Sequence, residues 1–131
     1  MQVVRTVKIE GADGLLLVAD EWGDPSHPAV LMCHGAGQNR YAWKTSAEIL
    51  STRVWFVVTL DARGHGDSDW SPDHRYDADD IGRDIEAVLQ RFTSPPAVVG
   101  ASMGGMASLA AQRNCKNQLF AALILVDITP H

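Results

Sequence analysis

The stretch Ala97-Val98-Val99-Gly100-Ala101-Ser102-Met103-Gly104-Gly105 decides the fold of this chain. A short apolar run at residues 97–100 is typical of a buried strand, and residues 103–113 follow a helical pattern. Glycines two residues before and after Ser102 predict a sharp strand-to-helix turn, where larger side chains would clash with the neighbouring strand and helix. We therefore predict that Ser102 is strained, exposed above the carboxyl ends of the strands and able to act as a nucleophile. The alternative is a small residue in a tight turn.

Apolar runs and helical patterns alternate outward from this turn. The expected strands are residues 3–10, 15–20, 29–33, 54–60, 97–100 and 119–126, and the expected helices are residues 41–50, 77–92 and 103–113. A glycine-rich turn joins the first two strands and predicts an antiparallel hairpin. The later strands are apolar throughout, which is typical of strands buried on both faces of a parallel sheet. The sequence therefore predicts an α/β fold, with a mostly parallel sheet, an N-terminal hairpin and flanking helices.

A second glycine-rich turn, His34-Gly35-Ala36-Gly37, follows the expected strand at residues 29–33. Acyl transfer needs two backbone N–H groups directed at the oxyanion, and glycines let such a loop approach a substrate closely. One donor is expected from Met103, the residue after the nucleophile, and the other from Ala36. Alone, the segment would be an ordinary glycine-rich turn, but together with Ser102 it predicts an oxyanion hole. We expect His34 to hold the loop rather than to act as a base.

Two further segments are Asp61-Ala62-Arg63-Gly64-His65-Gly66-Asp67-Ser68 and Leu125-Val126-Asp127-Ile128-Thr129-Pro130. Together with residues 34–37 and the turn around Ser102, they run along the chain in the order 34–37, 61–68, 100–104 and 125–130. These four segments resemble the α/β-hydrolase superfamily, in its branch of serine esterases and lactonases. The resemblance implies the strand order 1-2-4-3-5-6-7-8, a small ester-like substrate, and no metal or other cofactor. It also implies that Arg63 and Asp67 brace loops near the site. A serine at position 102 argues against the dehalogenases and epoxide hydrolases of the superfamily, which carry aspartate there.

The resemblance also implies that residues 1–131 form a single, partial domain, truncated after the first six of eight strands and without a lid. In the superfamily the triad runs nucleophile, acid, histidine along the chain. Asp127 ends the last expected strand and is a candidate acid; otherwise it caps a turn. No counterpart of the late histidine is expected, so the chain as written is predicted to be a very weak or inactive ester hydrolase. Two alternatives are a non-catalytic fragment or assembly module of the same fold, and a cofactor-free perhydrolase or haloperoxidase-like activity.

Composition argues against several classes of partner. The net charge is −5, from 11 Lys and Arg against 16 Asp and Glu, and without a basic stretch no nucleic-acid partner is expected. No apolar run approaches the ~20 residues that span a bilayer, and the first residues lack the pattern of a signal peptide. Cys33 and Cys115 are far apart and in no metal-ligand spacing, which suits a reducing compartment. We therefore expect a cytoplasmic protein with no membrane partner and no metal.

The last expected strand, residues 119–126, leads to an expectation about self-association. In the superfamily's order the sixth strand lies between the fifth and the seventh, so this apolar strand would form an exposed edge of the sheet. Exposed apolar edges pair with other chains. We therefore predict a homodimer or larger homo-oligomer joined along or near residues 119–126.

Overall fold

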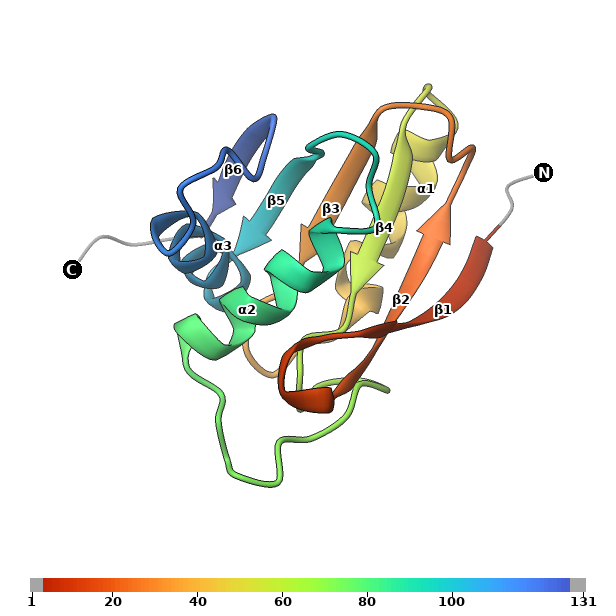
Figure 1. Ribbon diagram of the computed structural model, residues 1–131. Coiled ribbons are helices and arrows are strands. Elements are labelled where there is room, and N and C mark those ends of the chain that lie inside the picture. The colour runs from red at the N-terminus through yellow and green to blue at the C-terminus, as the bar shows by residue number, and fades with distance from the viewer. Residues whose placement is uncertain (1–3, 128–131) are drawn as a thin grey trace.

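Six strands form one mixed sheet in the computed structural model, which describes residues 4–127 (Figure 1). The strands are β1 (Val4–Glu10), β2 (Leu16–Trp22), β3 (Ala29–Cys33), β4 (Phe56–Leu60), β5 (Ala97–Ala101) and β6 (Ala122–Val126). Their order across the sheet is β1-β2-β4-β3-β5-β6. β1 pairs antiparallel with β2, and β2 with β4, whereas β4, β3, β5 and β6 run parallel to one another. The predicted strand order and the N-terminal hairpin are therefore confirmed.

Helices cover both faces of the sheet, as the continuous apolar strands predicted. The helices are α1 (Lys44–Ser51), α2 (Ala78–Leu89) and α3 (Met103–Arg113). Figure 1 shows α1 on one face and both α2 and α3 on the other. Successive residues of β3 point to opposite faces of the sheet. Met32 belongs to the apolar cluster that contains Ala47 of α1, and Leu31 belongs to the cluster that contains Ile85 of α2. Since four strands are parallel, the loops that follow them begin at the same edge of the sheet.

α2 begins where the sequence predicts. The Asp77 side chain accepts from the N–H of Asp80, and the Asp80 side chain accepts in return from the N–H of Asp77, which makes a capping box. The helix buries Ile81, Ile85, Val88 and Leu89 against the sheet side of the core. The helix ends at Leu89 rather than at residue 92, because the next N–H groups bond to carbonyls three residues back and tighten the last turn.

Two strands begin two and three residues later than predicted, each for a local reason. The strand expected from residue 54 begins at Phe56, because Val54 has a φ of 65° and a left-handed residue cannot continue a strand. The strand expected from residue 119 begins at Ala122, because the Leu119 N–H donates to the side chain of Gln112 instead of to a neighbouring strand. Residue 3 of the first expected strand and residues 128–130 of the last quoted segment lie outside the described residues.

The segment between β3 and β4 is also divided differently from the prediction. Instead of one helix over residues 41–50, a 3₁₀ turn at Arg40–Trp43 precedes α1. The side chain of Asn39 accepts from the N–H of Tyr41 and caps this turn. The turn carries the Arg40 side chain into the protein interior, a burial that the sequence did not predict.

β6 is the outermost strand on its side of the sheet among residues 4–127. Ile124 and Leu125 on this strand are 52% and 41% exposed, so the apolar edge expected from the sequence is present in the described part of the chain. Association through this edge stays a prediction. No helix within the described residues is both long and apolar enough to cross a membrane.

The packing of α2 against α3 generates a first prediction. A Cβ added at Gly82 of α2 would lie 2.9 Å from the carbonyl oxygen of Ala107 and 3.1 Å from the backbone nitrogen of Ala111, both on α3. Gly82→Ala gains about 1 kcal/mol of helix propensity but must separate the helices. We therefore expect a net loss of roughly 1–3 kcal/mol in the free energy of unfolding, measured by urea titration. The control Glu86→Ala on the same helix should change it by less than about 0.5 kcal/mol, and a stabilised Gly82→Ala protein would contradict this packing.

Candidate active site

Ser102 lies where β5 ends and α3 begins, with no linker between them. Its backbone has φ 48° and ψ −111°, a conformation that residues other than glycine rarely adopt and that costs on the order of 1–3 kcal/mol. The turn is held from both sides, because the Ser102 N–H donates to the carbonyl of Val126 (3.0 Å) and its own carbonyl accepts from the N–H of Met106 (3.0 Å). The serine is exposed. A strained backbone therefore presents an accessible hydroxyl at the carboxyl edge of the sheet.

The two glycines that flank the serine are sterically required. A Cβ at Gly100 would lie 2.6 Å from the Cα of Gly105, and a Cβ at Gly104 would overlap the carbonyl oxygen of Cys33 on β3. Both obstacles are backbone atoms, which cannot move without displacing a helix or a strand. The clash that the sequence predicts at these two positions is therefore confirmed.

The glycine-rich loop after β3 lies against the serine. A Cβ on Gly35 would be 3.5 Å from the Cβ of Ser102 and 3.6 Å from the carbonyl oxygen of Ala101, which is ordinary contact distance. β3 and β5 are parallel neighbours in the sheet, so the loops that follow them begin side by side. Two glycine-rich turns that are far apart in the sequence therefore meet at one place.

Three backbone donors of this loop already have acceptors. The Gly35 N–H donates to the Gln38 side chain (3.1 Å), the Gly37 N–H to Nε2 of His65 (3.1 Å), and the Gln38 N–H to the Gly35 carbonyl (3.1 Å). The N–H of Ala36 has no partner among residues 4–127, and Ala36 is exposed. Since backbone N–H groups are obligatory donors, this group is available to water or to a ligand.

Met103 carries the second expected donor. It is the first residue of α3, and the N–H groups in the first turn of a helix have no acceptor within that helix. The helix macrodipole adds a partial positive charge at the same end. The loop that lies against Ser102 and the first turn of α3 therefore each contain a backbone donor without an acceptor in the described part of the chain.

Comparison with known protein families identifies the fold. Residues 28–131 match the family model described as alpha/beta hydrolase fold. The chain belongs to this family. The match covers the turns at residues 34–37 and 100–104, the segment at residues 61–68 and β6, so the resemblance inferred from these segments is confirmed.

Curated relatives of this hydrolase-fold chain act on esters according to their names. The mouse sn-1-specific diacylglycerol lipase ABHD11 is 37% identical over 112 residues, which cover 82% of this chain and 35% of the relative. Esterase Rv0045c of Mycobacterium tuberculosis is 32% identical over 125 residues, which cover 94% of this chain and 40% of the relative. Other relatives are protein phosphatase methylesterases. Ester hydrolysis is therefore supported at the level of the family, and this chain spans two fifths or less of the first two relatives.

Solved structures agree with the family assignment. The esterase EaEST from Exiguobacterium antarcticum has a TM-score of 0.84 and 27% identity, over 92% of this chain and 44% of that chain. The epoxide hydrolase VrEH1 from Vigna radiata has a TM-score of 0.87 over 98% of this chain and 41% of that chain, but only 21% identity. The second similarity shows the fold alone.

Asp127, the candidate acid of this α/β hydrolase, follows β6 directly and is exposed. Val126 pairs with Ala101 in the parallel ladder of β5 and β6, so Asp127 and Ser102 leave neighbouring strands at the same edge of the sheet. Asp127 has a φ of 53°, a left-handed conformation that aspartate tolerates better than most residues. No hydrogen bond joins it to Ser102 within residues 4–127. The structure therefore brings the two residues to the same edge without linking them.

His34 is buried, and both of its ring nitrogens face backbone groups. Its Nδ1 lies 2.8 Å from the Gly35 carbonyl oxygen, and its Nε2 accepts from the N–H of Ala62 (3.0 Å). Burial lowers the pKa of His34, the hydrogen bond to the Gly35 carbonyl opposes this, His65 lowers the pKa further, and Asp61 raises it slightly. These contacts support the predicted role of His34 in holding the loop rather than in taking a proton from the serine.

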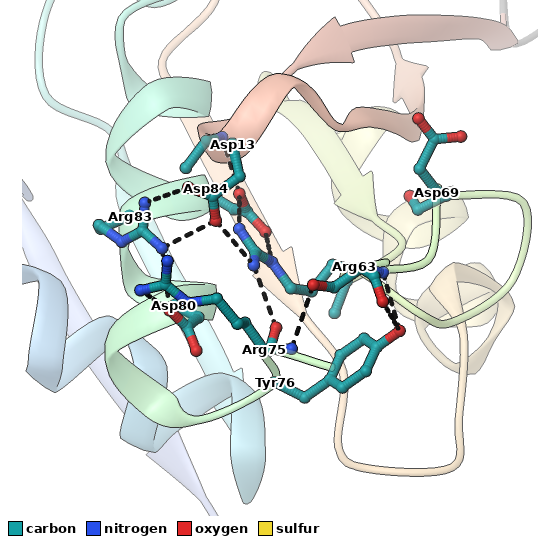
Figure 2. Close-up of polar contacts among 12 residues, drawn as sticks. Asp13, Arg63, Asp69, Arg75, Tyr76, Asp80, Arg83 and Asp84 are labelled. Carbon is teal, nitrogen blue, oxygen red and sulfur yellow. Dashed lines mark hydrogen bonds and ion pairs between the residues drawn. The ribbon is translucent and has the colours of Figure 1, made fainter. Parts of the chain in front are cut away.

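Arg63 braces three segments around the site, as the family resemblance implied. Its guanidinium is fully buried and forms a two-pronged pair with Asp84 of α2 at 2.6 and 2.8 Å. It also donates to Asp13 in the turn between β1 and β2 (3.1 Å) and to the carbonyl of Arg75 (3.0 Å). Figure 2 shows these groups meeting between α2, the hairpin turn and the long loop after β4. Arg83 joins the cluster through Asp13 and so ties α2 to the hairpin a second time.

Arg40 is a second buried cation, and the sequence analysis missed it. Its guanidinium pairs with Asp20 on β2 at 3.0 Å, with Asp61 after β4, and with Asp67 at 2.9 Å. The last pair links Asp67, in the loop after β4, to Arg40, which supports the bracing that the resemblance implied. The sequence signal for a buried cation was Asp20 and Asp61, each at the end of an expected apolar strand. A buried carboxylate needs a cation or several hydrogen-bond donors beside it.

Cys33 also lies beside the turn, but it is not a reactive group. It is buried at the end of β3, and burial raises the pKa of its thiol to about 12. Because the thiolate is the nucleophilic form, Cys33 is inert near neutral pH. No cluster of His, Cys, Asp and Glu side chains in the described residues is arranged to hold a metal ion.

The Arg63 cluster generates a second prediction. Arg63→Met removes the cation and leaves Asp84, which is 1% exposed, without its main partner. We expect the free energy of unfolding to fall by about 3–5 kcal/mol in urea titration, since an uncompensated buried charge is strongly destabilising. Arg113→Met is the matched control, because Arg113 and its partner Asp79 are both more than half exposed, and it should cost less than about 1 kcal/mol. Equal losses from the two substitutions would contradict the bracing role.

A third prediction concerns the pH dependence of stability. Because the pKa of His34 is lowered in the folded protein, the unfolded chain binds the proton first, and stability falls as the pH drops below about 6.5. The Arg83 hydrogen bond holds the pKa of Asp13 well below its usual range, so the contribution of Asp13 is complete above about pH 3.9 and is lost only below that value.

Urea titrations at a series of pH values separate these two steps. We expect His34→Gln to flatten the fall in unfolding free energy between about pH 7 and 5, since Gln can still accept from the Ala62 N–H but does not titrate. Asp13→Asn should leave this upper step unchanged and reduce the loss below about pH 4. An unaltered upper step in His34→Gln would show that His34 is not its source.

Proposed function

We propose that this chain carries the nucleophile and the oxyanion hole of a carboxylic-ester hydrolase that acts on small-molecule esters. Ser102 is the nucleophile, and the N–H groups of Ala36 and Met103 are the oxyanion donors. The observation that carries the proposal is the strained, exposed turn at Ser102 with the glycine-rich loop after β3 lying against it. The esterases and lipase among the curated relatives support the same chemistry.

In the proposed reaction, the Ser102 oxygen bonds to the carbonyl carbon of the ester while the carbonyl electron pair moves onto its oxygen. In this proposal the two backbone N–H groups stabilise the oxyanion, and donors fixed in a backbone need little reorganisation to do so. Collapse of the intermediate breaks the ester C–O bond, and the alcohol leaves with the proton that the serine lost. Water then hydrolyses the acyl-serine to a carboxylic acid and restores the hydroxyl.

A general base must take the serine proton, and the proposal assigns this role to neither His34 nor His65. Each of these histidines has both ring nitrogens facing backbone groups. Asp127 is the proposed acid that orients the base, because it follows β6 at the edge where Ser102 follows β5. Weak turnover by this chain alone stays a prediction.

Labelling of the full chain with a fluorophosphonate tests the proposal. The serine oxygen attacks phosphorus and displaces fluoride, and the serine proton passes to solvent. The developing charge falls on the phosphoryl oxygen, so an adduct reports a hydroxyl that the oxyanion donors assist even without a general base from this chain. We expect the adduct on the peptide that contains Ser102, mapped by mass spectrometry. Ser102→Ala should abolish it, whereas Ser46→Ala should retain it, because Ser46 is an exposed serine on α1.

Absence of an adduct at Ser102 would overturn the proposal and favour a non-catalytic module. Peroxide-dependent oxidation in carboxylate buffer that is lost in Ser102→Ala would instead support the perhydrolase alternative.

A further inference from the structure

Two loops at the carboxyl edge of the sheet exchange hydrogen bonds through a pair of histidines. His34, on the loop after β3, accepts at Nε2 from the N–H of Ala62, on the loop after β4 (3.0 Å). His65, on the loop after β4, accepts at Nε2 from the N–H of Gly37, on the loop after β3 (3.1 Å). The two rings lie 5.1 Å apart, centroid to centroid. Each loop therefore supplies both a histidine acceptor and a backbone donor to the other.

The remaining ring nitrogens define the protonation state of the pair. Nδ1 of His34 lies 2.8 Å from the carbonyl oxygen of Gly35, and Nδ1 of His65 lies 2.9 Å from the carbonyl oxygen of Arg63. A carbonyl only accepts, so each Nδ1 must carry the hydrogen, and each Nε2 then has the lone pair that the N–H of the opposite loop needs. Both bonds between the loops exist only while both rings are neutral with the hydrogen on Nδ1.

We propose that His34 and His65 are positioning residues that together fix the backbone of the loop after β3 and thereby aim the N–H of Ala36 at the site. The role of Ala36 in this inference rests on the proposed function. His34 and the Gln38 N–H hold the carbonyl of Gly35 on one side of Ala36, and His65 holds the N–H of Gly37 on the other. The Gly35 carbonyl and the Ala36 N–H belong to one planar peptide unit, so holding this carbonyl also fixes the direction of the Ala36 N–H. The bond at the Gly37 N–H fixes the next peptide unit, and the Ala36 N–H is left with the preorganisation that an oxyanion donor needs.

The histidine pair is itself anchored in the protein core. The Arg63 carbonyl that receives the hydrogen from His65 belongs to the residue whose buried guanidinium pairs with Asp84 of α2. Asp61, which precedes the second loop, is held by Arg40 and by the N–H of Asp67. The cations near the pair therefore have carboxylate partners, and the orientation of the loop after β3 is transmitted from α2 through Arg63 and His65.

Nitrogen NMR of the imidazole rings tests the protonation state. In the full chain at about pH 7.5, we expect the spectra of His34 and His65 to show the hydrogen on Nδ1 in both rings. His74 is exposed and serves as the reference for an unconstrained histidine. A hydrogen on Nε2 of either His34 or His65 would overturn the inference, because that nitrogen could not accept from the opposite loop.

Amide exchange tests the positioning. We expect His65→Ala to speed exchange of the Gly37 amide by about tenfold while the Ala62 amide is little changed, since the net strength of one such bond corresponds to roughly that factor. His65→Gln should keep part of the protection, because the Gln carbonyl oxygen can take the place of Nε2. His74→Asn is the control and should leave the Gly37 amide unchanged. A uniform rise in exchange across the chain, or no rise at Gly37, would overturn the positioning role.

The rate of fluorophosphonate labelling at Ser102 links the pair to the site. We expect His65→Ala to slow labelling by on the order of tenfold or more, His65→Gln to restore part of the rate, and His74→Asn to leave it unchanged. Unchanged labelling in His65→Ala, despite faster exchange at Gly37, would refute the link to Ala36. If the unsubstituted chain were not labelled at all, the proposed function would fail, whereas the ring spectra and amide exchange would still decide whether the histidine pair fixes the loop.

Discussion

Excluded volume around Ser102 is the constraint on which the rest of the site depends. Gly104 lies against the Cys33 carbonyl, so α3 can begin directly beside the end of β3 only because position 104 has no side chain. Gly100 lies equally close to Gly105, which lets the helix turn back over its own strand. These contacts force the backbone of Ser102 out of the ordinary regions and expose its hydroxyl. The serine's position therefore follows from close backbone packing, which hydrogen bonds to Val126 and Met106 then secure.

Buried charge organises the loops around this turn. Arg40, in the turn before α1, pairs with Asp61 just after β4, and Arg63 lies within the stretch after β4. Each cation is also held by carboxylates from other parts of the sequence. A buried ion pair contributes little net stability compared with apolar packing, but breaking one is costly. Such pairs therefore select one arrangement of the loops over others. In this chain the selected arrangement places His65 where it bonds to the loop that carries Ala36.

The prediction from sequence succeeded where a signal is local. The apolar runs at β3 and β5 and the spacing of α3 are complete within a few residues, and their predicted positions agree closely with the structure. It failed where a single residue departs from its neighbours, as at Val54, whose left-handed backbone delays β4. It also failed at Leu119, because a side chain from the preceding helix takes the N–H that a strand would use. Neither the left-handed backbone nor this hydrogen bond can be recognised from the hydrophobicity of the neighbouring residues.

The same distinction between local and long-range interactions applies to the candidate site. By itself, the sequence determined the sharp turn at Ser102 and the need for glycine at positions 100 and 104, because steric exclusion acts between residues that are close in the chain or in adjacent strands. It also determined the order of the strands through the family resemblance. Only the tertiary structure decided that Arg40 is buried and that His65 holds the N–H of Gly37, because the partners in these contacts are separated by more than twenty residues and meet only after the sheet has formed. Hydrogen bonds and ion pairs are directional and short in range, so no sequence pattern specifies them until folding has brought the groups together.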